Sequence, residues 1–365
     1  RSSDYINRAS VRCLTLSAAC LLIFMILSQQ AMAQDLFTED TVKISAVTVT
    51  ARAAARLTPF TVEDIDPALL SRYDDDDLAT LLSSASGLFV RRNGNQGLAS
   101  VSIRGMSGSH TLVTWNDLPL NAPGNGFSDF TIIPLMAATT VRIISGGADL
   151  DDVTGYIGGK VELATEPEFG TGMEAEAGIG AGSYGELRSS ASFTAGNRRF
   201  YGRVNAWGEK GRNDFRFINE DAPGGATHDR RSNASYLSAG IIGDIGYKNG
   251  ASQVSAHLWF NDSDRELPGP VTTVQQDFDE RQTDRSFRGV VKYSSDGGRL
   301  TAGVTAGFSH DINRYFHMSP ANNGDNNSST AMLRMRLHLR LSEKTGLTLN
   351  AGDTFERASA LSFEK

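Results

Sequence analysis

The sequence predicts an exported protein in which an α+β domain is followed by an antiparallel β-barrel that spans a membrane. Three observations point to this fold class: an apolar N-terminal segment with a cleavage site, mixed helix and strand signals over residues 58–165, and alternating strands over residues 170–365. Gly is frequent, with 37 residues, and Pro is rare, with 10, a composition that favours many short strands. The alternating region provides about nine strands, so we expect an incomplete barrel in this chain.

Residues 1–33 have the pattern of a secretory signal peptide. A basic start is followed by the apolar run CLTLSAACLLIFMIL and by Ala-Met-Ala, and we expect cleavage after Ala33. The alternative is a membrane-spanning helix, but the apolar run is shorter than the ~20 residues that such a helix needs. Cys13 and Cys20 both lie in this segment, so the mature chain is expected to contain no disulfide and no thiolate metal site.

Residues 34–57 form a polar, Ala-rich tether. Within it, the stretch ISAVTVTAR alternates like a β-strand, although no neighbouring segment provides a partner strand. A disordered linker is one interpretation of this composition. The other is a strand that pairs with the sheet edge of a different protein.

A helix is expected after the four consecutive acids Asp74 to Asp77. The segment LATLLSSAS follows them, and Gly87 comes at its end. Acidic side chains cap the free N–H groups of a first helical turn, and Gly commonly terminates a helix. A cation site formed by the same acids is the alternative interpretation.

From Gly170 onward, segments of about ten alternating residues follow one another to the end of the chain. In QVSAHLWFN, Leu258 and Phe260 fall on one face and His257 and Trp259 on the other. The segments RLTAGVTAGFSHD and AMLRMRLHLRL alternate in the same way. An apolar face opposite a polar face is typical of a strand that contacts lipid or a core on one side only.

The connections between these strands alternate in length. Short turns are expected near residues 195–197, 247–250, 295–298 and 342–346, and long polar loops near residues 211–233, 263–283 and 312–329. Outer-membrane barrels keep short turns at the periplasmic end and long loops at the extracellular end. Closure into a barrel is required because no strand edge can remain unpaired in hydrocarbon. The apolar faces are therefore expected to contact lipid, and the polar faces to line the lumen.

A basic stripe on one strand face supports the same orientation. Its members are Arg334, Arg336, His338 and Arg340. Each basic residue would cost ~2–4 kcal/mol in the middle of the lipid, so the stripe is expected to face the lumen. There it would pair with carboxylates of the lumen or of a domain inside the barrel, or it would attract an anionic ligand.

Residues 78–165 resemble the plug domain of TonB-dependent outer-membrane receptors. The resemblance runs through LATLLSSASGLFVRR, ASVSIRGMSGSHTLVTWNDLPLN, IIPLMAATTVRIISGGADL and GYIGGKVELAT, in the order and spacing of the family. It implies a plug inside a barrel of ~22 strands. It also implies that AVTVTAR is a TonB box centred on Val47, Thr48, Val49, Thr50 and Ala51.

The resemblance implies a plug–barrel contact at Arg104, where the family has an arginine that pairs with barrel carboxylates. The family usually has a second arginine at the position of Ser145, and its absence here weakens the expected attachment. Four glycines suit tight turns and close backbone approaches inside a barrel: Gly105, Gly155, Gly158 and Gly159.

Within the family, WNDLPLNAPGNGFSDFTIIP and SDRELPGPV are most similar to the branch of cobalamin-receptor-like proteins. The implied substrate-loop candidates are Asn121, Asn125, Phe127 and Asp129. The family usually has Gly where Asp117 stands, so the match is imperfect. Acidic loop residues of this branch can bind calcium, and the acids at 262–266 and 277–280 would be the candidates, although solvated surface acids are the alternative. No other cofactor is expected.

The resemblance implies an active-transport receptor in the outer membrane of a Gram-negative bacterium. The expected nutrient is cobalamin or a related corrinoid, and the alternative is a ferric siderophore. The expected partners are the TonB protein of the inner-membrane energy-transducing complex and the outer-membrane lipid. A passive binding or adhesion protein is the other function class that remains open. The net charge of −7 without a basic cluster argues against a nucleic-acid partner, and no pattern of residues indicates an enzyme.

Overall fold

The structure, a computed structural model, describes residues 61–94, 96–146, 156–220, 224–269, 279–317, 319, 323–343 and 345–360. These residues belong to one compact unit that begins at Pro59. The expected signal peptide at 1–33 and the expected TonB box at 47–51 lie outside the described residues. Among the residues described, no helix has the length and apolar character needed to cross a membrane.

Residues 61–165 form an N-terminal α+β domain with a five-stranded sheet of order β1-β6-β7-β4-β5. Strands β4 and β7 are parallel, and the other pairs of this sheet are antiparallel. A separate hairpin joins β2 and β3. The elements are β1 (Thr61–Asp64), α2 (Pro67–Arg72), α3 (Leu78–Ala85), β2 (Phe89–Arg92), β3 (Ala99–Ser102), β4 (Thr111–Trp115), β5 (Leu118–Pro119), β6 (Thr140–Ser145) and β7 (Gly159–Ala164), with short 3-10 turns η2 (Gly108–His110), η3 (Phe130–Ile132) and η4 (Leu135–Ala137).

The predicted helix after the acidic run is α3. The Asp77 carboxylate accepts a hydrogen bond of 2.7 Å from the Thr80 backbone N–H, which satisfies one of the free donors of the first turn. The same carboxylate pairs with Arg92 at 2.5 Å. Leu78, Leu81 and Leu82 are buried on one face of the helix, and they anchor it to the core of the domain.

Strands β4 and β5 are joined by Asn116 and Asp117, both with positive φ, at 51° and 73°. Two consecutive residues of positive φ make a type I′ turn, in which Gly is the favoured second residue. Asp tolerates this region at a cost of about 1 kcal/mol. Trp115 and Leu118 on either side of the turn are completely buried, and so is Asn116 within it.

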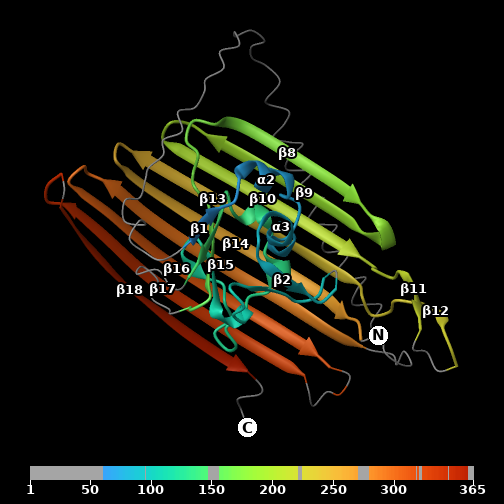
Figure 1. Ribbon diagram of the computed structural model, residues 1–365. Coiled ribbons are helices and arrows are strands. Elements are labelled where there is room, and N and C mark those ends of the chain that lie inside the picture. Colours follow the sequence, from blue (N-terminus) through green and yellow to red (C-terminus); the bar gives the residue numbers. More distant parts are fainter. Residues whose placement is uncertain are drawn as a thin grey trace, which may run out of the picture. The chain divides into compact units, whose positions relative to one another are not determined.

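Residues 172–360 form a nine-stranded antiparallel sheet in which sequential strands are neighbours (Figure 1). The count agrees with the nine strands expected from the alternating pattern. A small hairpin of β11 (Arg216–Asn219) and β12 (Thr227–Arg230) lies between two of these strands in the sequence. The nine strands are β8 (Gly172–Ala181), β9 (Leu187–Gly196), β10 (Phe200–Gly211), β13 (Tyr236–Asn249), β14 (Ser252–Leu267), β15 (Glu280–Asp296), β16 (Leu300–Phe316), β17 (Gly324–Arg340) and β18 (Gly346–Ala360).

The predicted alternation of short turns and longer connections is confirmed. The strand bounds leave short turns at 197–199, 250–251, 297–299 and 341–345 at one end, and longer connections at 212–235, 268–279 and 317–323 at the other. Two expected loops are shorter than the predictions of 263–283 and 312–329, because the strands extend beyond their apolar part. In that extension, cross-strand pairs such as Asp262 with Arg285 replace the apolar alternation.

The two faces of the sheet differ as the alternation predicted. Leu258, Phe287 and Leu333 are 53%, 45% and 56% exposed on the outer face. On the opposite face, His257 and Trp259 are buried against the N-terminal domain, with Trp115 of that domain 5.5 Å from the ring of Trp259. We call the face that contacts the N-terminal domain the inner face.

Candidate functional site

Arg265 forms the most completely buried polar contact between the N-terminal domain and the sheet. Its side chain lies on the inner face of β14 and is 2% exposed. One guanidinium nitrogen, Nη1, donates to Asp129 Oδ2 at 2.8 Å and to Thr131 Oγ1 at 3.1 Å, both in the N-terminal domain. The other, Nη2, donates to Asp284 Oδ2 of β15 at 2.6 Å. The buried cation is thereby balanced by two carboxylates, as burial of a charge requires.

Asp129 is held rigidly for this contact. Its Oδ1 accepts hydrogen bonds from the Thr131 backbone N–H at 3.1 Å and the Thr131 hydroxyl at 2.7 Å, and so caps the short turn η3. It also accepts from the Ala99 backbone N–H at 3.1 Å. Because the Asp129 carboxylate bonds to β3, to η3 and to Arg265 of β14, a movement of one of these three elements affects the other two.

Asp117 forms a second contact with the sheet. Its Oδ2 lies 3.3 Å from Lys292 Nζ of β15 and accepts a hydrogen bond of 3.4 Å from Thr305 Oγ1 of β16. Burial alone would raise the pKa of this carboxyl, but Lys292, Lys160 and Arg334 outweigh it, and the pKa lies below its ordinary value of 3.8. The Asp117 carboxylate is therefore surrounded by positive charge.

Asp76 forms a third contact. Arg188 of β9 donates to Asp76 Oδ1 at 2.8 Å, and its Nε lies 2.7 Å from a carboxylate oxygen of Glu186. Nearby, the Asn205 side chain of β10 donates to the Met136 backbone carbonyl at 3.0 Å. The N-terminal domain is thus attached to several strands of the sheet.

Aromatic packing supports the polar contacts. Trp115 makes edge-to-face contacts with His257 at 6.3 Å and with Trp259 at 5.5 Å, and its indole N–H donates to the Ala137 carbonyl at 2.8 Å. The guanidinium of Arg288 lies 4.4 Å from the centre of the Trp259 ring. These rings supply a large apolar contact, and the edge-to-face geometry adds about 0.5–1.5 kcal/mol per pair.

Ser255, His257 and Asp244 form a hydrogen-bonded chain on the inner face that the sequence did not reveal. His257 Nδ1 lies 2.7 Å from Asp244 Oδ1, and His257 Nε2 lies 3.0 Å from Ser255 Oγ. Arg203 donates two hydrogen bonds to the other oxygen of Asp244. The three residues are almost fully buried, so the chain satisfies polar groups beneath the N-terminal domain and offers no access to a substrate.

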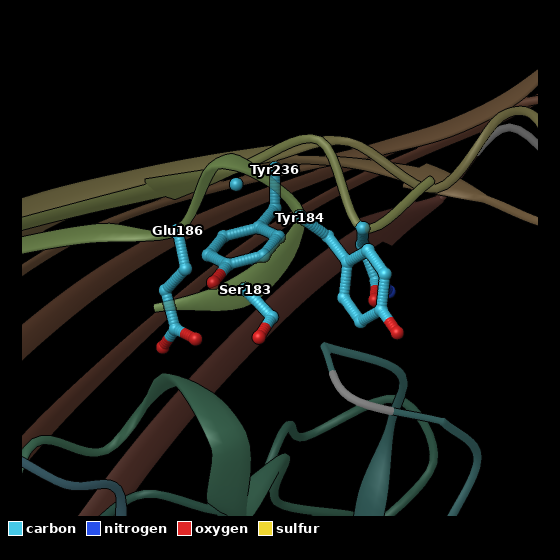
Figure 2. A pocket seen from close by; sticks show the side chains of 6 residues that line it. Ser183, Tyr184, Glu186 and Tyr236 are labelled. Carbon is cyan, nitrogen blue, oxygen red and sulfur yellow. The ribbon is translucent and has the colours of Figure 1, made fainter. Parts of the chain in front are cut away.

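A pocket of about 320 Å³ lies at the end of the sheet that carries the longer connections. Its lining includes Ser183, Tyr184 and Glu186 from the β8–β9 connection and Tyr236 at the start of β13. Figure 2 shows the Glu186 carboxylate and the hydroxyls of Ser183 and Tyr184 pointing to the same side. The Tyr236 hydroxyl is buried and lies beside the Gln96 side chain of the N-terminal domain. The pocket therefore offers aromatic surface together with polar atoms.

The four predicted substrate-loop residues have different environments. Asn121 is buried, and its side chain bonds the Val113 N–H at 2.8 Å and the Thr111 carbonyl at 2.9 Å. Asp129 is engaged by Arg265. Asn125 is exposed and Phe127 is half-buried. Asn121 and Asp129 thus hold the loop in place, and ligand contact at all four residues stays a prediction.

Arg104 has a positive φ of 53° and an exposed side chain. No ion pair joins it to a residue that the structure describes, so its pairing with barrel carboxylates stays a prediction. The following Gly105 also has a positive φ, of 76°, which marks a tight turn. Gly158 and Gly159 lie at close backbone approaches, because a Cβ on Gly159 would come within 2.4 Å of the Ile144 carbonyl oxygen.

The basic stripe lies on β17. Arg334 is close enough to lower the pKa of Asp117 in the N-terminal domain, which puts Arg334 on the inner face. His338 Nδ1 lies 2.8 Å from Thr348 Oγ1 of β18. Arg336 and Arg340 have the same parity on the strand and fall on the same face.

The acids at 262–266 lie in β14, whereas they were expected in a loop. Asp262 pairs with Arg285 at 2.7 Å, and Asp264 pairs with Arg281. Among the described residues, no group of three or more His, Cys, Asp or Glu side chains is arranged to hold a metal ion. In the second predicted stretch, Glu280 accepts a hydrogen bond from the Tyr315 hydroxyl at 2.7 Å. Arginine and tyrosine partners thus occupy these carboxylates.

Sequence reasoning missed the role of Arg265 because it lay in a segment interpreted as a loop. The alternating pattern of this strand could have revealed it. Every second residue faces inward, and Arg265 continues the series Ser255, His257, Trp259, Asn261 and Ser263. If the predicted strand had been extended from Asn261 to Arg265, the prediction would have placed the Arg265 guanidinium on the inner face.

These features define a nine-stranded antiparallel sheet with an α+β domain attached to its inner face. Residues 54–160 match the family described as TonB-dependent Receptor Plug Domain. This segment of the chain is therefore a plug domain of that family.

Solved structures of such receptors have the same fold. The siderophore receptor PiuA from Acinetobacter baumannii matches with a TM-score of 0.63 at 16% identity, over 83% of this chain and 46% of that one. The copper transporter OprC matches with a TM-score of 0.58 at 16% identity, over 82% and 47%. The ferric-catecholate import receptor Fiu from E. coli matches with a TM-score of 0.59 at 13% identity, over 83% and 50%. The chain spans about half the length of these structures.

Proposed function

We propose that the protein is an active-transport receptor that imports a scarce, large nutrient across the outer membrane. The observation that carries this proposal is the attachment of the plug to the inner face of the barrel strands through Arg265 and its two carboxylate partners. Because the three charged groups are largely buried, separating them is costly. Passage of a large ligand through the lumen requires the plug to move, and a receptor of this design needs an energy source.

The energy source in this proposal is TonB, acting on the N-terminal tether. Residues 47–51 alternate like a strand, which suits addition to the sheet edge of another protein. A pull on this strand is transmitted to the plug. The corresponding division of the chain is a signal peptide at 1–33, a tether at 34–57, the plug at 58–165 and barrel strands from 170 to 365.

A ferric siderophore is the proposed ligand class. PiuA is named as a siderophore receptor and Fiu as a ferric-catecholate import receptor. The pocket beside Tyr184 and Tyr236 supplies aromatic surface and hydroxyl groups at the long-loop end of the sheet. Phe127 and Asn125 of the substrate loop add a further aromatic and amide surface. Such a combination suits a large ligand with planar and polar parts.

A corrinoid is the second candidate, and the substrate loop favours it. The segments WNDLPLNAPGNGFSDFTIIP and SDRELPGPV resemble the cobalamin-receptor-like branch, and they contain the residues that surround Arg265. Both candidates share the plug, the barrel and the energy coupling, so they differ only in the surfaces that contact the ligand.

Growth tests separate these candidates. The full-length gene is expressed in a strain that lacks its own receptors for both nutrients, with either a ferric siderophore or cobalamin as the only supply. We expect growth with the ferric siderophore. Growth with cobalamin alone would establish the corrinoid, and growth with neither would reject both ligand classes.

Deletion of residues 47–51 tests the energy coupling separately. We expect the deletion to abolish uptake but to leave ligand binding to whole cells unchanged, because the plug and the extracellular surfaces are intact. A deletion of equal length elsewhere in the tether, outside residues 44–52, is the control. Undiminished uptake after removal of 47–51 would contradict the energised mechanism and would favour a passive binding protein.

A further inference from the structure

The ion pairs between plug and barrel share one polarity. Asp76 pairs with Arg188 at 2.8 Å, Asp129 with Arg265 at 2.8 Å, and Asp117 with Lys292 at 3.3 Å. In these three pairs, the carboxylate belongs to the plug and the cation to a barrel strand. We call Asp76, Asp117 and Asp129 the plug carboxylates.

This polarity is the reverse of the one that the resemblance implied. The expected contact was a plug arginine, Arg104, paired with barrel carboxylates, and Ser145 stands where a second plug arginine is usual. In the structure Arg104 is exposed and has no ion pair with a described residue. The pairing of Arg104 stays a prediction, and the plug carboxylates are contacts that the resemblance did not imply.

Asp117 is the plug carboxylate whose position calls for an explanation. It occupies the second place of a type I′ turn, with a φ of 73°, where Gly would avoid the cost of a left-handed backbone. A residue that is less favourable for the backbone is retained when its side chain makes a compensating contact. The contacts with Lys292 and Thr305 are such a compensation.

The barrel wall is shaped to receive this turn. Leu118, next to Asp117, lies so close to β16 that a Cβ on Gly307 would be 3.1 Å from its Cδ1 atom. Lys292 and Thr305 come from β15 and β16, and Arg334 from β17. These contacts lie toward the end of the sheet with the short turns, whereas Arg265 and Asp284 lie toward the end with the long loops.

We propose that Asp117 is a positioning residue that attaches the β4–β5 turn of the plug to strands β15–β17, and that the plug carboxylates together contribute to holding the plug against the barrel wall. Asp117 lies on the side from which a periplasmic partner would pull. Its contacts are therefore among the first to break when the plug is displaced, while the deeply buried Asp129–Arg265 pair separates later. The attachment itself does not depend on which ligand is transported.

The test measures how often the plug leaves the lumen. The full-length receptor is inserted into planar lipid bilayers, and conductance is recorded at a fixed, sub-denaturing urea concentration. Asp117→Asn keeps a side chain that tolerates the left-handed backbone and removes only the charge. We expect it to raise the frequency of open channels about 5–30-fold, the factor that corresponds to a change of one or two kcal/mol.

Three further variants isolate the contact. Lys292→Gln, on the barrel side, is expected to raise the frequency by a similar factor, and the double variant Asp117→Asn/Lys292→Gln by no more than the larger single effect. Asp117→Gly removes the backbone strain and the carboxylate together, and it should also open the channel. Asp64→Asn is the matched control, because Asp64 pairs with Arg142 inside the plug at 2.6 Å.

Two outcomes would overturn the proposal. One is an open-channel frequency for Asp117→Asn equal to that of the unchanged receptor. The other is a double variant whose effect equals the product of the two single effects, since independent sites are additive in free energy. If Asp117→Asn fails to fold, Lys292→Gln is measured alone. A raised open-channel frequency then supports the proposal, and an unchanged frequency overturns it. The recording needs no ligand and no TonB, so failure of the uptake tests would leave its result unaffected.

Discussion

At the scale of single residues, the buried charges decide how firmly the plug is held. Arg265 is 2% exposed and makes ion pairs with Asp129 and Asp284, whereas the Arg285–Asp262 pair on neighbouring strands is 61% and 42% exposed. Removing one partner from a buried pair leaves an uncompensated charge, but an exposed pair contributes little. Arg265 and Arg285, on neighbouring strands, therefore contribute very differently to the stability of the receptor.

Replacement of Arg265 by Ala is expected to destabilise the plug by about 3–5 kcal/mol, because Asp129 and Asp284 lose their shared cation in a buried environment. Arg285→Ala is the matched control, with an expected change of about 0–1 kcal/mol. Hydrogen exchange of the β3 and η3 amides reports the loss, since Asp129 binds both segments. Equal protection in the two variants would show that Arg265 does not hold the plug.

At the scale of elements, strand alternation predicted most of the architecture. The period-two pattern identified nine strands and the orientation of Leu258 and Trp259, because lipid on one side and the plug on the other impose opposite chemistry on the two faces. It failed where Asp262 and Arg285 continue the ladder through charged pairs. The contacts of Arg265 and Asp117 escaped prediction because they join residues more than a hundred positions apart in the sequence.

The assignment of the outer face is tested by placing a charge on it. Leu258 is 53% exposed on β14, and Leu258→Arg should cost about 2–4 kcal/mol near the middle of the lipid. Gln253→Arg, on the inner face of the same strand and near its short-turn end, is the control and is expected to assemble normally. The measurement is the fraction of receptor that folds into vesicles. Equal assembly of the two variants would contradict the lipid-facing assignment of Leu258.

At the scale of the whole molecule, Asp117 makes retention of the plug depend on pH. Asp117 has a folded-state pKa below its ordinary value of 3.8, because the charges of Lys292, Lys160 and Arg334 outweigh its burial. A carboxyl of lowered pKa stabilises the folded state above its unfolded pKa, and this contribution is lost as the pH falls through the folded pKa. Asp74 acts in the opposite direction, because burial, Asp75 and Glu176 raise its pKa.

A comparison of the receptor with its Asp117→Asn variant separates the effect of Asp117 on the pH dependence from the effect of Asp74. At pH 7 the unchanged receptor should retain its plug more firmly than the variant, because Asp117 is ionised beside three cations. As the pH falls below about 4, Asp117 begins to gain a proton, and the difference between the two proteins should shrink toward zero. Asp74 is present in both and cancels, and so does Glu162, which lies 3.7 Å from Lys160. Open-channel frequency in planar bilayers from pH 7 to pH 3 measures this difference, and a difference that stays constant over that range would show that the Asp117 charge does not hold the plug.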